Sequence, residues 1–278
     1  MARILAISSY VASGHVGLAA IVPVLQAFGH EVIAVPTVVL SCHNGHSHVR
    51  GVAMEAGDIA GILSALRANG TLESVDAVIT GYMPNAEVTE LVAEELERLA
   101  TMLPEMLYLC DPVLGDDPDG LYVVEDVART IRDRLLPIAD IVTPNRFELT
   151  WLTGVAVENA NDADLAADSI GVELVVVTSV PAESGMIANV SSDSNEALMF
   201  ATSRLAAVPH GTGDVLAALV LGHVLAGCGF GEATAKASAG VQVVIEDSLD
   251  ADELHLVAGL SQIVEAESLP AQVVVGDD

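Results

Sequence analysis

Short aliphatic segments alternate with longer amphipathic or alanine-rich segments along this chain, and this alternation is what most constrains the fold. Each aliphatic segment is continuous and bounded by polar or turn residues, which is typical of a buried strand: residues 3–7, 31–35, 77–80, 106–110, 138–142 and 174–178. The segments between them have helical spacing: residues 15–28, 56–68, 86–100 and 124–135. The alternation predicts βαβ units, and therefore a three-layer α/β/α fold around a mostly parallel sheet.

The rest of the chain completes this pattern. Residues 185–190 and 197–201 predict a hairpin or a pair of edge strands, and three helices are expected after them: residues 214–226, 232–245 and 251–265. Neither an internal repeat nor a linker is visible. We therefore expect residues 1–278 to form a single domain with a frayed end at residues 276–278.

Charge and hydropathy exclude several classes of partner. The formal net charge is −29, from 39 Asp and Glu against 10 Lys and Arg, so no basic surface for nucleic acid or an anionic membrane is expected. The content of 52% apolar residues is too high for a disordered acidic chain. The longest apolar tract, residues 215–228, is interrupted by His223 and is too short to cross a bilayer.

Cysteine usage indicates the compartment. Cys42, Cys110 and Cys228 lie far apart in the sequence and are odd in number. They form neither a disulfide framework nor a metal-binding motif. A reducing cytoplasm is therefore the expected location.

Small or polar residues stand at the carboxyl end of almost every predicted strand. In open α/β sheets the ligand lies outside these strand ends, so a site is expected along this edge. Loops are polar in any case, which explains each single position but not the whole set: Ser8, Ser9, Gly81, Tyr82, Asp111, Pro112, Thr143, Pro144, Asn145, Thr178 and Ser179.

The segment His210-Gly211-Thr212-Gly213-Asp214, followed by an apolar helix, is the most informative motif. Two glycines allow a ligand to approach the backbone, and the free N–H groups at the start of the helix attract an anion such as a phosphoryl group. Asp214 would lie beside this anion, where it could accept a proton from an attacking hydroxyl group. The alternative is an ordinary glycine-rich turn with Asp214 as a helix N-terminal charge, and the motif alone does not separate the two.

Taken together, the blocks of this sequence resemble the pyridoxal kinases of the ribokinase-like superfamily. The resemblance extends from Ile4 to about Ile245. It rests on the order of these blocks, which are jointly specific: Ser8-Ser9, Gly14-His15-Val16-Gly17, Ser41-Cys42-His43-Asn44-Gly45, Thr80-Gly81-Tyr82, Asp111-Pro112-Val113-Leu114-Gly115, Thr143-Pro144-Asn145-Arg146-Phe147-Glu148, Val177-Thr178-Ser179 and Gly211-Thr212-Gly213-Asp214.

The resemblance implies a role for each matching position. Asp214 would be the catalytic base, and Gly211, Thr212 and Gly213 would form the anion hole for the γ-phosphoryl group. On the ATP side, Asp111 and Glu148 would bind Mg²⁺, the latter through water. Contacts to ATP are implied for Asp111, Thr143, Asn145, Glu148 and Thr178, and contacts to pyridoxal for Ser9, Asn44, Gly45, Tyr82 and Asp214.

The same resemblance implies ATP as co-substrate, a possible dependence on K⁺ and a homodimer. One departure concerns the vitamin: Leu40 and Asn44 stand where family members commonly carry an aromatic residue and a threonine. This departure leaves a hydroxymethylpyrimidine or related vitamin-precursor kinase as an alternative, with a sugar kinase less favoured. A nucleotide or vitamin sensor that retains the fold is the alternative without catalysis.

Several of these residues also have an ordinary structural interpretation. Asp111 could open a turn before Pro112, and Asn145 with Glu148 has the form of a helix capping box. His43, His46 and His48 alternate in a way that also suits metal ligands, but we interpret them first as loop histidines in solvent and second as part of a lid.

Overall fold

A computed structural model describes residues 1–205 and 208–275. The predicted frayed end, residues 276–278, lies outside this range. Within it, ten strands form one sheet in the order β12-β11-β10-β9-β8-β5-β4-β1-β2-β3. The strands are β1 Arg3–Val11, β2 Glu31–Leu40, β3 Gly51–Ala53, β4 Ala77–Thr80, β5 Leu107–Cys110, β8 Ile141–Val142, β9 Leu174–Pro181, β10 Met186–Ser192, β11 Ala197–Ser203 and β12 Gln272–Val273.

The centre of this sheet is parallel and its two margins are antiparallel. Strands β2, β1, β4, β5, β8 and β9 pair in parallel, as the βαβ pattern predicts. At one margin β3 runs antiparallel to β2, and at the other β10, β11 and β12 add three antiparallel strands. A small separate hairpin, β6 Gly115–Asp116 and β7 Gly120–Leu121, follows β5.

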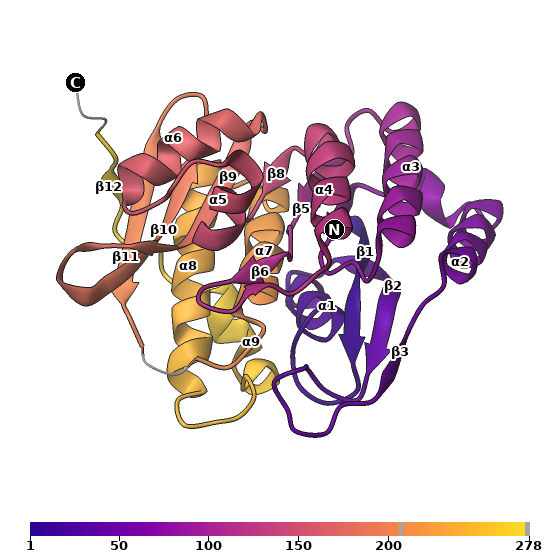
Figure 1. Ribbon diagram of the computed structural model, residues 1–278, viewed down its shortest axis with the longest axis horizontal. Coiled ribbons are helices and arrows are strands. Elements are labelled where there is room, and N and C mark those ends of the chain that lie inside the picture. The colour runs from indigo at the N-terminus through magenta and orange to yellow at the C-terminus, as the bar shows by residue number, and fades with distance from the viewer. Residues whose placement is uncertain (206–207, 276–278) are drawn as a thin grey trace.

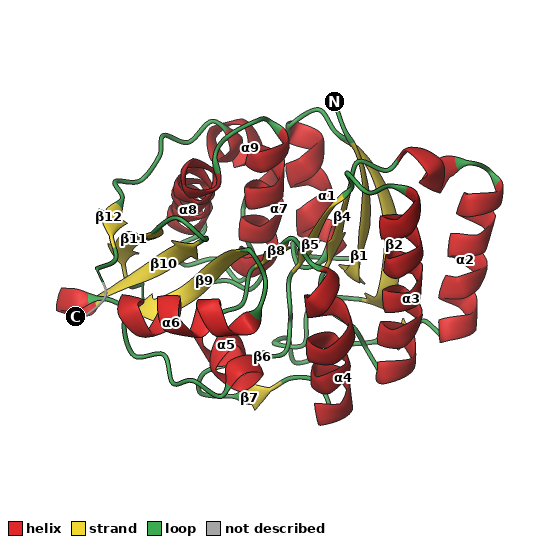
Figure 2. Ribbon diagram, turned by 90° about the horizontal axis from the view of Figure 1, so that it is seen from above, coloured by secondary structure: helices red, strands yellow, loops and turns green. Residues whose placement is uncertain are grey.

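Helices cover both faces of the sheet, so the three-layer α/β/α architecture is confirmed (Figure 2). One face carries α2 Ala56–Ala68, α3 Ala86–Met102, α4 Glu125–Thr130, α5 Arg146–Thr153 and α6 Ala160–Ile170. The other face carries α1 Leu18–Ala27, α7 Thr212–Leu225, α8 Phe230–Asp247 and α9 Leu256–Val264.

Strand β1 shows why the central strands are continuously apolar. Leu5 and Ile7 pack into the core beneath α2–α6, whereas Ile4 and Ala6 pack into the core beneath α1 and α7–α9. A strand buried on both faces needs apolar residues at every position, and the sequence therefore does not alternate there. The same double burial places β1 between the two helix layers, in the right-hand part of the molecule in Figure 1.

Several predicted boundaries differ from the structure. Helix α1 begins at Leu18 and not at His15, because Gly14 and Gly17 adopt left-handed backbone angles before it. Helix α9 begins at Leu256, after a turn at Asp250 with positive φ. Helices α5 and α6 were absent from the expected set.

No helix in the described part of the chain combines the length and apolar character that crossing a bilayer requires.

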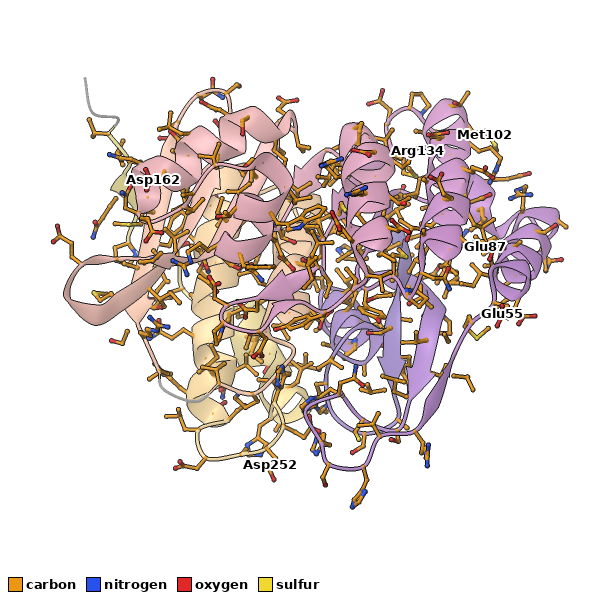
Figure 3. The ribbon with its side chains drawn as sticks, in the orientation of Figure 1. Glu55, Glu87, Met102, Arg134, Asp162 and Asp252 are labelled. Carbon is orange, nitrogen blue, oxygen red and sulfur yellow. The ribbon has the colours of Figure 1, made fainter. Side chains whose placement is uncertain are left out.

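The acidic surface predicts a stability that depends on salt. Glu55, Glu87 and Asp252 are exposed; the first two lie at the right-hand edge of the molecule in Figure 3 and the third at its lower edge. With a formal net charge of −29, carboxylates repel one another over the surface. Raising NaCl from about 0.05 M to about 1 M shortens the screening length from more than 10 Å to about 3 Å and is expected to raise the melting temperature. Scanning calorimetry in chloride salts checks this, and a constant or falling Tm would contradict it.

Candidate active site

The backbone N–H groups of residues 211–213, at the start of α7, form a group that we call the anion cradle. Gly211 is the N-cap at φ 107°, and a Cβ there would overlap the carbonyl oxygen of His15, so only glycine fits. No described side chain caps this helix. The N–H groups of its first turn and the positive end of its dipole therefore remain available to an anion.

Asp214 lies in this first turn, partly exposed, with its carboxylate bonded by the backbone N–H of Gly17. Burial raises the pKa of Asp214 to about 6, against the opposing effect of that hydrogen bond. A Cβ on Gly81, just after β4, would lie 4.0 Å from Oδ1 of Asp214. The carboxylate thus faces the ends of the central strands with a pKa suited to a base near neutral pH.

Asp111 follows β5 and is buried. The hydroxyl of Thr143 donates a hydrogen bond of 3.0 Å to its Oδ1. Burial raises the pKa of Asp111 to about 8, with the negative charge of Asp214 acting in the same direction. Asp214 is therefore close enough to Asp111 to affect the ionisation of Asp111.

Glu148 connects two segments of the same edge. It forms a capping box with Asn145 at the start of α5, and it also accepts hydrogen bonds from the backbone N–H groups of Leu114 at 2.8 Å and Gly115 at 3.4 Å. Burial, and then the charge of Asp111, raise its pKa well above the usual value. The capping interpretation is confirmed, and the same carboxylate lies beside Asp111.

These carboxylates fit Mg²⁺ by their chemistry. Asp111 and Glu148 are buried and Asp214 is partly buried; loss of solvent around each of them raises its pKa, with no positive side chain among the causes to offset the effect. A divalent cation with oxygen ligands would relieve this repulsion. Glu148 already accepts three backbone hydrogen bonds, so its approach to an ion would be through water.

The two remaining ATP-side candidates lie next to this group. Thr178 of β9 donates its N–H to the carbonyl oxygen of Pro144 at 2.9 Å and forms a bridge with Asn145. Asn145 in turn donates from Nδ2 to the carbonyl oxygen of Gly115 at 2.8 Å. The structure thus brings the five predicted ATP-side residues into one continuous edge.

The predicted vitamin-side residues lie at the ends of β1 and β4. Ser9 sits at a register shift in β1, and a Cβ on Gly17 would overlap its Oγ. Ser8 Oγ accepts a 3.1 Å hydrogen bond from the N–H of Tyr82, whose ring packs against the core beneath α2 and α3. The sequence analysis places Ser8 at this edge and Gly17 in a matching block, but it assigns no role to either; the structure makes them packing and hydrogen-bond partners of Ser9 and Tyr82.

Asn44 and Gly45 are exposed in the loop between β2 and β3. The ring of His43 lies 4.4 Å from that of His210, the residue before Gly211, so the loop lies beside the anion cradle. His48 is exposed as expected, but the expectation of solvent-exposed histidines was wrong for His43 and His46, which are partly buried.

The fold and this site together define a kinase of the ribokinase-like class. A family model described as phosphomethylpyrimidine kinase matches residues 13–258. The chain is 39% identical to pyridoxal kinase PdxY of Rubrobacter xylanophilus, over 94% of this chain and 93% of that protein. It is 33% identical to pyridoxal kinase of Bos taurus, over 79% and 76% of the two chains.

Solved structures agree with these relatives. The pyridoxal kinase of Entamoeba histolytica superposes with a TM-score of 0.93 at 26% identity, covering 99% of this chain and 100% of that one. The pyridoxal kinase of Leishmania donovani in complex with ADP and pyridoxamine has a TM-score of 0.92 at 28% identity, covering 98% and 99%. The chain belongs to the pyridoxal kinase family.

Proposed function

We propose that this protein phosphorylates the 5′-hydroxymethyl group of pyridoxal with ATP, which yields pyridoxal 5′-phosphate and ADP in vitamin B6 salvage. The observation that carries this proposal is the position of Asp214, a carboxyl group with a pKa of about 6 in the first turn of an uncapped helix. Relatives that match this protein over nearly the whole chain are named pyridoxal kinases. Solved structures of similar pyridoxal kinases contain ADP together with pyridoxamine or pyridoxine.

Each site residue then has a task in the transfer. Asp214 takes the proton of the substrate hydroxyl as its oxygen forms a bond to the γ-phosphorus, while the bond from that phosphorus to the departing ADP oxygen breaks. The N–H groups of residues 211–213 hold the transferred group, whose charge would otherwise repel the carboxylate. Ser9, Asn44, Gly45 and Tyr82 orient the vitamin, whereas Thr143, Asn145 and Thr178 position the nucleotide.

Magnesium would be held by Asp111 directly and by Glu148 through water. When bound, Mg²⁺ neutralises charge on the phosphates. The chain has few cationic side chains for this purpose, 10 against 39 acidic ones.

Replacing Asp111 with asparagine is expected to raise the Mg²⁺ concentration needed for half-maximal rate by about tenfold or more, because it removes a charged oxygen ligand. Glu148→Gln is expected to act in the same direction. Initial rates over a Mg²⁺ titration check this, with the exposed Asp168→Asn in α6 as control. Unchanged Mg²⁺ profiles in both variants would remove these residues from the metal site.

The alternative within the fold is a hydroxymethylpyrimidine kinase, since the matching family model is described by a kinase of a related pyrimidine, phosphomethylpyrimidine. A coupled assay of ADP release with pyridoxal, pyridoxamine, pyridoxine, hydroxymethylpyrimidine and ribose separates the candidates. We expect turnover of pyridoxal. Turnover of the pyrimidine alone would replace the proposal, and ATP binding without any turnover would favour a sensor.

We also propose a homodimer and a cytoplasmic location. The homodimer and any dependence on K⁺ are supported by the resemblance alone. The location is supported by three cysteines that are free thiols, as expected in a reducing compartment. Light scattering tests the dimer, and rates in K⁺ against Na⁺ buffers test the monovalent ion.

A further inference from the structure

Three side chains form a polar cluster where the loop that joins β2 and β3 meets the segment before α9. His43 and His46 belong to this loop, and Glu253 lies in the segment before α9. One potential ligand atom from each residue lies within 4.8 Å of the other two. His46 Nε2 is 2.8 Å from Glu253 Oε1. The cluster contains none of the carboxylates at the strand ends.

Figures 1 and 3 show where these segments meet. Asp252, next to Glu253 in the sequence, lies on the lower edge of the molecule, where the loop between β2 and β3 also lies. The hydrogen bond between His46 and Glu253 spans 207 residues of sequence. The cluster therefore connects two segments that nothing in the local sequence holds together.

The cluster has bonding capacity that the described residues do not use. Oε2 of Glu253 is buried without a hydrogen-bond partner, and leaving a buried acceptor unsatisfied costs free energy. The ring centroids of His43 and His46 are 4.4 Å apart, and the ring centroid of His210 also lies 4.4 Å from that of His43.

We propose that His43, His46 and Glu253 form a binding site for a divalent transition-metal ion such as Zn²⁺, with His210 beside it as a fourth ligand. Two or three imidazole nitrogens with one carboxylate suit Zn²⁺ and similar ions. Mg²⁺ prefers oxygen ligands alone, so this site differs from the nucleotide magnesium site in chemistry and in residues.

Binding requires a modest contraction of the loop. Ligand atoms around a tetrahedral Zn²⁺ lie about 3.3 Å apart, given zinc–nitrogen distances near 2.0 Å. The candidate ligand atoms now lie within 4.8 Å of one another, so the longer of these distances must shorten. His43 Nδ1 now accepts a hydrogen bond from the N–H of Gly45. Ligation of His43 is expected to rearrange residues 43–45 and exchange this bond for one to the metal.

An ion at this position would fasten the substrate loop to the anion cradle. Asn44 and Gly45 lie between the two ligand histidines, and His210 immediately precedes Gly211. On the other side, Leu254, next to Glu253, lies against the position of a Gly211 Cβ. Metal binding itself needs neither substrate, so its test does not depend on the proposed kinase activity.

The test is a metal-binding titration of the full chain after bound metal has been removed with a chelator. Zn²⁺ is added while a chromophoric chelator competes for it. About 0.5 M NaCl screens weak binding to surface carboxylates. We expect a saturable site of one equivalent per chain and a higher Tm with Zn²⁺. Co²⁺ should give the visible absorption of a four-coordinate site. His46→Ala and Glu253→Gln should each lower the affinity about 100-fold or more, since loss of an outer-shell partner alone costs 10–100-fold.

His48→Ala, in the same loop but outside the cluster, is the matched control and should bind as the unchanged chain does. Glu253→Gln keeps the shape of the side chain, and it carries the test if His46→Ala melts earlier in chelator. One-equivalent binding that persists in a His43→Ala/His46→Ala double variant would overturn the proposal. So would an unchanged chain that binds Zn²⁺ no more tightly than that double variant.

Discussion

Asp214→Asn is expected to lower kcat by about 10²–10⁴-fold, the usual contribution of a general base. An amide cannot accept the proton of the substrate hydroxyl, but it can still accept the hydrogen bond that Gly17 donates to the carboxylate. ATP should therefore bind with a similar Kd. Steady-state kinetics and an ATP titration of the same preparation check both parts.

The pH profile provides a second measurement of the same group. Because the pKa of Asp214 is raised to about 6, the base is protonated below that pH, and kcat/KM should fall as pH is lowered through about 6. In the variant this limb should disappear from the residual rate. Asp58→Asn is the matched control, since Asp58 is exposed and also lies in the first turn of a helix, α2. Full activity in Asp214→Asn would reject this residue as the base.

Although Asp214→Asn loses activity, its folded state should be at least as stable as that of the unchanged chain above pH 6. The folded pKa of Asp214, about 6, lies above the unfolded value, so its contribution to stability is full at low pH and is lost as pH rises through about 6. At pH 8 the ionised carboxylate opposes folding, and the neutral amide removes that cost. Asp214→Asn should melt no lower than the unchanged chain at pH 8, which separates a lost base from a damaged fold.

Gly211→Ala is expected to abolish most of the activity and to lower the melting temperature. The added Cβ would overlap the carbonyl oxygen of His15, and alanine would also be strained at φ 107°. Either the turn or the segment at His15 must move, and the N–H groups of residues 211–213 would lose their alignment toward a common anion. Activity per folded molecule and Tm by calorimetry measure the two effects.

Gly227→Ala separates the two effects expected of Gly211→Ala, because it adds backbone strain at a positive φ without any steric overlap of the new Cβ. Gly227 lies just beyond the other end of α7 at φ 92°, and a Cβ added there would meet no atom within 4 Å, so this variant should lose about 1 kcal/mol of stability and keep its activity. Gly213→Ala, whose Cβ meets no protein atom, should fold normally and raise the KM for ATP. An active Gly211→Ala would contradict the anion cradle.

Elements with strong local signals could be predicted from the sequence. Residues 77–80 and 56–68 were predicted with the bounds that β4 and α2 have, because apolar spacing and flanking turns agree there. Helix α5 was missed as an element even though its capping box, Asn145 with Glu148, was visible. At eight residues it is too short for periodicity to distinguish it from a loop.

Long-range arrangements could not be predicted in this way. No local pattern indicates that the N–H of Gly17 faces Asp214 or that His46 pairs with Glu253, since both depend on how the sheet brings loops together. The ionisation of Asp111 is of the same kind, because its pKa depends on burial and on Asp214. The resemblance to a family supplied the candidate residues, and the fold supplied their neighbours.

The strand order carries one more consequence. Five adjacent strands, β1, β4, β5, β8 and β9, hold or lead into six of the candidate site residues: Ser9, Tyr82, Asp111, Thr143, Asn145 and Thr178. Neighbouring strands lie about 4.8 Å apart. The strand ends therefore make a ledge about 19 Å long, with the predicted vitamin-side residues at the β1 end and the predicted nucleotide-side residues at the β9 end. Under this assignment, two substrates on the ledge would meet end to end, near Asp111 and Asp214. Either molecule could then arrive or depart without passing over the other, so a random order of binding is the kinetic pattern this geometry permits.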